Sequence, residues 1–219
     1  YVDGIDIEGN MRTLDRVIRR EFRLAEGDAF NTSKLRRSQQ RIRNLGFFKK
    51  AEVTNVPGSA PDRTVINVEV VEQSTGELSF GAGFSTSEAP LGDISIRERK
   101  LLGRGQDLRL AFLISGRTQQ IDLSFTEPYF LERNVAAGFD LFRIERDNQD
   151  RSSFDQKSVG GALRLGYQIT ENLRETLRFT LREDDITKID RGASRIIQDQ
   201  EGKRTTSLVG QTLFYDRRD

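Results

Sequence analysis

The sequence predicts a small α+β domain over residues 1–75, of order strand, helix, helix, strand, strand, followed over residues 76–219 by about eight antiparallel strands of a transmembrane β-barrel. Three observations carry this prediction. Apolar side chains recur at helical spacing in two segments before residue 46. From residue 76 to residue 217 they alternate with polar ones, with the period of two that is typical of strands. The connections in this second region alternate between tight turns and longer polar loops.

The composition excludes several classes of site. The 219 residues carry a net charge of +1, which argues against a nucleic acid partner, because phosphate-binding domains are usually basic. Cysteine and histidine are absent, so disulfides, cysteine nucleophiles, serine–histidine–aspartate triads and the common zinc sites are excluded from this stretch. Carboxylates, lysine and tyrosine remain as possible catalysts. With the family resemblance described below, we expect no enzyme activity, no catalytic residue, no metal and no cofactor.

The chain has no apolar run that would cross a membrane as a helix. No segment approaches ~20 consecutive apolar residues, and the first residues lack a signal-peptide pattern. The chain starts at Tyr1 in what reads as a strand and stops at Asp219 straight after another, so we expect a fragment of a longer protein.

The elements of the first domain follow from local patterns. Helix caps are expected at Asn10 or Thr13 for the first helix and at Asn31 or Thr32 for the second, with Gly46 ending the second helix. The five elements are expected at residues 1–10, 13–22, 31–45, 51–56 and 63–72.

The second helix carries a basic face with two possible interpretations. Such a face can bind nucleic acid or lipid headgroups, but it can also be a solvated helix surface, since acidic residues lie nearby and interleaved aromatic residues are missing. We favour the solvated surface. The face consists of Lys34, Arg36, Arg37, Arg41 and Arg43.

Several stretches of the first domain resemble a POTRA domain, the polypeptide-transport-associated module. They are YVDGIDIEGN, LRRSQQRIRNLGFF and INVEVVE, and the most specific piece is Leu45-Gly46-Phe47-Phe48. A second interpretation is that Gly46 merely ends a helix and the two phenylalanines merely fill the core. Both hold together if the motif is a folding motif.

The second region favours a membrane barrel over a soluble sandwich. Its strands are about ten residues long, as a tilted membrane-crossing strand requires. Tight turns (LLGRGQ, QITENL) alternate with longer polar loops near 145–156 and 184–204, and no helix layer is present to cover a sheet. The expected strands are 76–86, 91–101, 105–115, 118–127, 135–147, 154–170, 171–184 and 205–217.

With the POTRA-like domain in front, the segments LSFGAGFST, LLGRGQDL, LSFTEPYF and FYDRRD resemble the first half of the barrel of BamA-type outer-membrane protein assembly factors. The resemblance implies a POTRA domain in the periplasm next to the N-terminal half of a barrel in the Gram-negative outer membrane. It implies unfolded outer-membrane protein clients, accessory lipoproteins and outer-membrane lipid as partners.

The family resemblance also implies a working edge. The barrel closes by pairing its first and last strands, and this seam can open so that a client strand pairs with the first strand by β-augmentation. The glycines of that strand either weaken the edge or accommodate curvature and neighbouring bulk, and the sequence does not decide between these. The edge residues, acting through their backbone, are Leu78, Ser79, Phe80, Gly81, Ala82, Gly83 and Phe84.

Other functional predictions remain beside this one. Glu26, between the two helices, is a candidate contact for an accessory protein, with plain loop solvation as the alternative. A POTRA-barrel transporter that secretes a polypeptide would share the architecture. Two further alternatives would have a different architecture. One is a soluble β-rich binding protein, and the other is a hydrolase that uses the loop carboxylates Glu183, Asp184 and Asp185.

Overall fold

The computed structural model describes residues 1–86, 89–149, 154–170, 172–189 and 194–217. The chain forms two compact units. The first unit comprises Tyr1–Gly76 together with Arg99–Gln106, and the second comprises Glu77–Glu98 and Asp107–Asp219. The chain therefore passes between the units three times.

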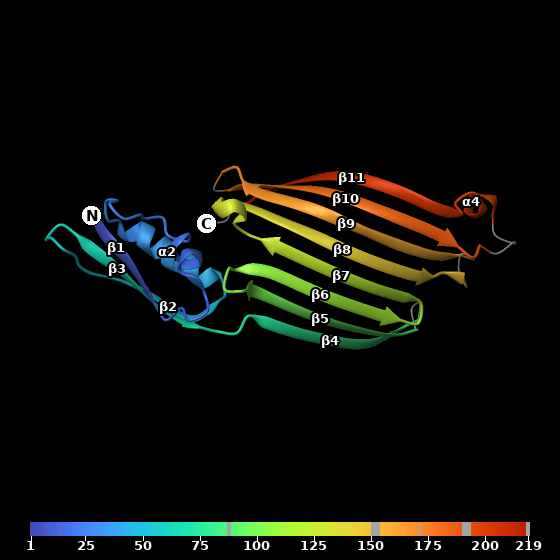
Figure 1. Ribbon diagram of the computed structural model, residues 1–219, viewed down its shortest axis with the longest axis horizontal. Coiled ribbons are helices and arrows are strands. Elements are labelled where there is room, and N and C mark those ends of the chain that lie inside the picture. The colour runs from blue at the N-terminus through green and yellow to red at the C-terminus, as the bar shows by residue number, and fades with distance from the viewer. Residues whose placement is uncertain (87–88, 150–153, 171, 190–193, 218–219) are drawn as a thin grey trace. The chain divides into compact units, whose positions relative to one another are not determined.

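The first unit is a three-stranded sheet with two helices, in the predicted order. Its strands are β1 (Val2–Glu8), β2 (Phe48–Pro57) and β3 (Thr64–Glu72), arranged β1-β3-β2. Strand β3 is parallel to β1 and antiparallel to β2. The helices are α1 (Asp15–Arg19) and α2 (Thr32–Asn44), and α2 lies against the sheet (Figure 1). Side chains from α2 and from the sheet share one buried core, which includes Leu35, Ile42, Ile66 and Val68.

The second helix begins as predicted and the first does not. The Asn31 side chain accepts a hydrogen bond from the Lys34 amide at 3.0 Å, which caps α2. Helix α1 has only five residues, and its N-cap, Leu14, makes no side-chain capping bond. The predicted caps are engaged elsewhere: the Thr13 hydroxyl donates to Glu72, and the Asn10 amide donates to Asp15 at 2.6 Å.

The basic face of α2 is partly neutralised within the first unit. Arg41 forms an ion pair with the buried Glu21, with 2.9 Å between Nη2 and Oε2. The Arg43 guanidinium donates to the carbonyl of Ala51 at 3.2 Å. These contacts use part of the face for holding the helix to its own domain, in line with the solvated-surface interpretation.

The second unit is one eight-stranded sheet in sequence order from β4 to β11 (Figure 1). From β6 to β11, neighbouring strands are antiparallel and in continuous register. Its strands are β4 (Gly76–Ser85), β5 (Ala89–Leu101), β6 (Gln106–Ser115), β7 (Thr118–Glu127), β8 (Val135–Asp147), β9 (Asp155–Gln168), β10 (Leu173–Thr187) and β11 (Gly202–Tyr215). In the described part of the chain β4 and β11 do not pair, so the sheet is open. The predicted fold class is confirmed.

The longer connections differ from prediction at their ends. Strand β10 continues to Thr187 and β11 begins at Gly202, so the connection predicted over 184–204 is shorter and contains a one-turn helix, α4 (Arg195–Gln198). Within the predicted strands and loops, residues 150–153, 171 and 190–193 lie outside the described residues. No helix in the described ranges is long and apolar enough to cross a membrane.

The register sorts the side chains of the second sheet onto two faces. Across six neighbouring strands, from β6 to β11, one row of facing residues is entirely apolar. We call the side that carries this row the apolar face. The row is Leu108, Phe125, Phe139, Leu163, Phe179 and Val209. Several of these side chains are exposed, Leu163 to 63%, so the face requires an apolar surrounding.

Candidate functional site

Strand β4 lies at one end of the sheet order. It neighbours β5, and no strand of the described ranges pairs with its other side. An edge strand of this kind presents backbone amide and carbonyl groups to a further strand. All seven residues predicted for the working edge, Leu78 to Phe84, lie within β4.

The side chains of this edge do not cover its backbone. Phe80 is 83% exposed, and Leu78 and Phe84 are also exposed on the same side of the strand. Ser79, Gly81 and Gly83 alternate with them, so the opposite side carries small groups. The arrangement offers little side-chain specificity and an accessible backbone.

The two glycines in the middle of β4 have different surroundings. A Cβ atom at Gly81 would collide with the carboxylate of Asp93 on β5, so Gly81 leaves room for a neighbour. A Cβ at Gly83 would make only an ordinary contact, 3.6 Å from Leu91 Cδ1. Accommodation of neighbouring bulk therefore explains Gly81, whereas Gly83 lowers the stability of the strand without such a cause.

The polar face of the sheet carries an ion-pair network away from this edge. Asp140 on β8 accepts a hydrogen bond from Ser124 at 2.8 Å and forms ion pairs with Arg164 and Arg178, each at 3.0 Å. These four side chains come from β7, β8, β9 and β10. The network ties four strands together.

The candidate catalytic carboxylates are placed differently from prediction. Glu183, Asp184 and Asp185 belong to β10 and not to a loop, so neighbouring members point to opposite faces. Asp184 is buried and accepts from Arg182 at 2.8 Å, and Glu183 pairs with Lys203 at 3.1 Å. The three side chains do not converge on one point.

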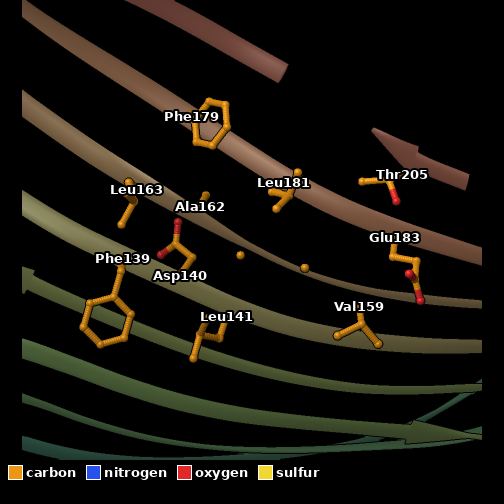
Figure 2. A pocket seen from close by; sticks show the side chains of 12 residues that line it. Phe139, Asp140, Leu141, Val159, Ala162, Leu163, Phe179, Leu181, Glu183 and Thr205 are labelled. Atoms are coloured by element: carbon orange, nitrogen blue, oxygen red, sulfur yellow. The ribbon is translucent and has the colours of Figure 1, made fainter. Parts of the chain in front are cut away.

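The apolar face is hollowed over β8, β9 and β10. Figure 2 shows Leu141, Leu163, Phe179 and Leu181 around this hollow, which measures about 690 Å³. Gly161 lines the hollow and lies opposite both Leu141 and Leu181 in the register. The lining of the hollow is mostly apolar and suits hydrocarbon. The Gly160-Gly161 pair within β9 was a signal in the sequence that periodicity alone did not interpret.

The POTRA signature residues do more than fill the core. Phe47 and Phe48 are buried, with ring centroids 6.3 Å apart in an edge-to-face arrangement, and Gly46 has φ +69° after α2. In addition, the carbonyls of Gly46 and Phe47 accept hydrogen bonds from the side chain and the backbone of Gln73, at 2.9 and 3.0 Å. The motif thus holds the residue that follows β3.

Glu26 lies between α1 and α2, as expected. Its carboxylate pairs with Arg19 Nη1 at 3.3 Å, and both side chains are exposed. In the described part of the chain no group of three or more acidic side chains is placed to hold a metal ion.

The comparisons with known proteins agree with this architecture. The Omp85 superfamily domain matches residues 100–219, more than half of the chain. The chain belongs to the Omp85 superfamily. The POTRA family described as a surface antigen variable number repeat matches residues 1–73. The predicted resemblance is confirmed, and membership places this Omp85 chain in the outer membrane with its POTRA domain in the periplasm.

Individual relatives of this Omp85 chain are similar over its whole length. The outer membrane protein assembly factor BamA of Nitratidesulfovibrio vulgaris is 31% identical over 219 residues, which cover all of this chain and 27% of the relative. The chain thus spans about a quarter of that relative. The crystal structure of BamA from Haemophilus ducreyi lacking POTRA domains 1–3 superposes with a TM-score of 0.79 and 25% identity, over 99% of this chain and 44% of that one.

A further solved structure shares the fold. CdiB from Escherichia coli superposes with a TM-score of 0.60 over 99% of this chain and 42% of that chain, at 14% identity. At this identity the likeness shows the fold alone. It therefore gives no support to a secretion activity.

Proposed function

We propose that this chain is part of an insertase that receives unfolded outer-membrane proteins in the periplasm and templates their folding at β4. The observation that carries the proposal is the edge, because β4 pairs on one side only in the described part of the chain. Strand side chains stand above and below the sheet, so they leave the backbone groups of this free side accessible. A relative named as an outer membrane protein assembly factor supports the proposal.

The chemistry of this edge suits varied clients. A client strand that adds to β4 gains main-chain hydrogen bonds, each worth roughly 0.5–1.5 kcal/mol net, and these do not depend on the client's side chains. Outer-membrane clients share strands but not sequences. Recognition through amides and carbonyls therefore fits a general assembly role.

The proposed activity needs neither a catalytic residue nor a cofactor. Two of the carboxylates that a hydrolase would use are already engaged: Asp184 accepts hydrogen bonds from Ser158 on β9 and from Arg182, and Glu183 pairs with Lys203 on β11. The exposed apolar row disfavours a soluble binding protein. The expected partners are unfolded clients, accessory lipoproteins and outer-membrane lipid, with no nucleic acid. Glu26 remains our candidate for an accessory-protein contact.

Proline substitution along β4 tests the proposal. Neighbouring residues of a strand direct their N–H groups to opposite sides, so Ser79→Pro and Phe80→Pro remove one donor toward β5 and one toward the free side. We expect the variant that loses the outward donor to reduce client insertion in cells. Phe80→Ala is the matched control, because it removes the ring and keeps the amide. Unchanged insertion in both proline variants would contradict the proposal.

A further inference from the structure

The turn between β5 and β6 belongs to the first compact unit, which contains the POTRA domain and is called the POTRA unit below. Residues Arg99–Gln106 belong to the first unit, and the carbonyl of Gly103 accepts a hydrogen bond from the Leu14 amide at 3.0 Å. Lys100 in this turn is 7% exposed and pairs with Glu72 at 3.7 Å. A buried lysine is costly unless it is paired, so the turn has a fixed place on this unit.

Glu72, the last residue of β3, accepts several hydrogen bonds beside Lys100. Its carboxylate accepts from the backbone amides of Arg12 and Thr13, at 3.1 and 2.7 Å, and from the Thr13 hydroxyl. Burial acts to raise the pKa of Glu72, but the hydrogen bonds from Thr13 and Arg12 and the charge of Lys100 together lower it below its ordinary value. The ionised form is therefore the one that the site stabilises.

The POTRA signature motif lies against the same point. Gln73 is held by the carbonyls of Gly46 and Phe47, and its own carbonyl accepts a hydrogen bond from Lys100 Nζ at 3.5 Å. At Gly105 a Cβ atom would lie 3.3 Å from Cε2 of Phe47, so the turn backbone packs closely on the Phe47 ring. The motif contacts both the start of the linker to β4 and the turn after β5.

These contacts have a topological consequence. Gln73 precedes β4 and Lys100 is the residue before the last one of β5, so nearly the whole β4–β5 hairpin lies in the chain between two residues that touch. Both ends of the hairpin are thus held at one place on the POTRA unit. The remainder of β4, from Leu78 onward, is beyond these contacts.

We propose that Glu72, Lys100 and Gly103, with Gln73 held by the signature motif, form a root clamp that fixes the base of the β4–β5 hairpin on the POTRA domain. The clamp keeps β4 attached and in register at its base while its edge receives a client strand. The second statement rests on the proposed function, and the clamp itself does not.

Two glycines of the POTRA unit give a matched pair of variants. Gly103 has φ +71°, and a Cβ there would collide with the carbonyl oxygen of Arg12. Gly27 has φ +89° with no atom within 4 Å of a Cβ. Alanine therefore strains the backbone at both positions, but only Gly103→Ala displaces the turn.

The experiment measures amide hydrogen exchange in the full-length protein in lipid vesicles, without client. In Gly103→Ala we expect roughly tenfold faster exchange in peptides covering 11–16 and 76–80, and no such change in Gly27→Ala. Lys100→Gln should act in the same direction, and Lys100→Arg, which keeps the charge, should restore most of the protection. This second pair keeps the test open if Gly103→Ala does not fold.

Each outcome bears on a separate part of the proposal. Unchanged exchange at 11–16 in both Gly103→Ala and Lys100→Gln would overturn the clamp. Faster exchange at 11–16 with none at 76–80 would overturn its hold on the hairpin. Faster exchange at both with undiminished client insertion would overturn its role in assembly. Failure of the β4 proline test would remove the proposed function and leave the exchange result to decide the clamp.

Discussion

The POTRA unit encloses its apolar side chains between one sheet and two helices, whereas the barrel unit displays them on an open face. Ile42 and Ile66 in the first unit are fully buried, while Leu163 and Phe179 in the second are about half exposed or more. Both regions use the same residue types. The two units differ in the solvent around their apolar side chains. The POTRA unit encloses them in a core that is surrounded by water, whereas the barrel unit places them on an open face against lipid.

The two units also differ in where their ion pairs lie. In the POTRA unit, Glu72 and Lys100 meet where the chain leaves for the barrel. In the barrel unit, Asp140 joins four strands on the face opposite the apolar rows. The Asp140 network therefore lies on the side of the sheet that the apolar row does not occupy.

The largest expected effect is loss of core volume in the POTRA unit. Ile42→Ala removes a fully buried side chain and should lower the free energy of unfolding of this unit by about 2–5 kcal/mol. The rate of proteolysis of the periplasmic unit in the membrane-inserted protein measures it. Val56→Ala, at an exposed position, is the control, and equal effects of the two would contradict the assigned core.

A charge on the apolar face should be next in size. Leu163→Arg places a guanidinium against lipid, and near the bilayer midplane this costs about 2–4 kcal/mol. Unfolding in urea from lipid vesicles would measure the change. Gln120→Arg lies on the polar face beside Asp122, whose carboxylate can pair with the new guanidinium, and should be tolerated. If both substitutions cost the same, the assignment of faces is wrong.

Loss of the central carboxylate should have a smaller effect. Asp140→Asn leaves Arg164 and Arg178 without their ion pair, and charge-assisted hydrogen bonds of this kind contribute roughly 1.5–3 kcal/mol. The urea midpoint of the vesicle-inserted protein should fall. Asp122→Asn, at another position on the polar face, tests whether any loss of charge has the same result.

The smallest expected effect is the pH dependence of the POTRA unit. The folded-state pKa of Glu72 is lowered, so its contribution to stability is present above its unfolded pKa and is lost as pH falls through the folded pKa. The pKa of Asp3 is also lowered, to about 2, by hydrogen bonds from Ser59 and Arg63. The readout is therefore the difference between the wild type and Glu72→Gln in proteolysis rate from pH 6 downward, which should shrink in acid. A constant difference would contradict the assigned ionisation.

Local sequence patterns predicted most of this fold, because the alternation of apolar and polar residues identifies a strand without knowledge of its partners. The expected strand 118–127 is β7 to the residue, and Asn31 caps α2 as expected. What the sequence could not show depends on distant partners. Thr13 fails to cap α1 because its hydroxyl binds Glu72, 59 residues away. Asp185 was placed in a loop, beyond the expected strand 171–184, because consecutive acids obscure the alternation that β10 continues.

The edge at β4 and the root clamp differ in how far the sequence indicates them. Strand β4 was located by its alternation, which is a local feature, whereas its role as a working edge follows from the family resemblance and stays a prediction. The clamp was not predictable, because Lys100 lies 28 positions beyond Glu72 and the Gly46 carbonyl bonds to Gln73 through tertiary packing. Motif similarity located Gly46 and Phe47 without indicating what their backbone holds.

The most direct test of client templating uses the absence of cysteine from this chain. Single cysteines at Ser79 or Gly83 in β4, and at Leu123 in the middle of the sheet, can be paired with cysteines along the first and last strands of a client during assembly. The account predicts disulfides from the β4 positions in one strand register and none from Leu123→Cys. Equal yields from β4 and β7, or no cross-link at β4 while clients are still inserted, would contradict it.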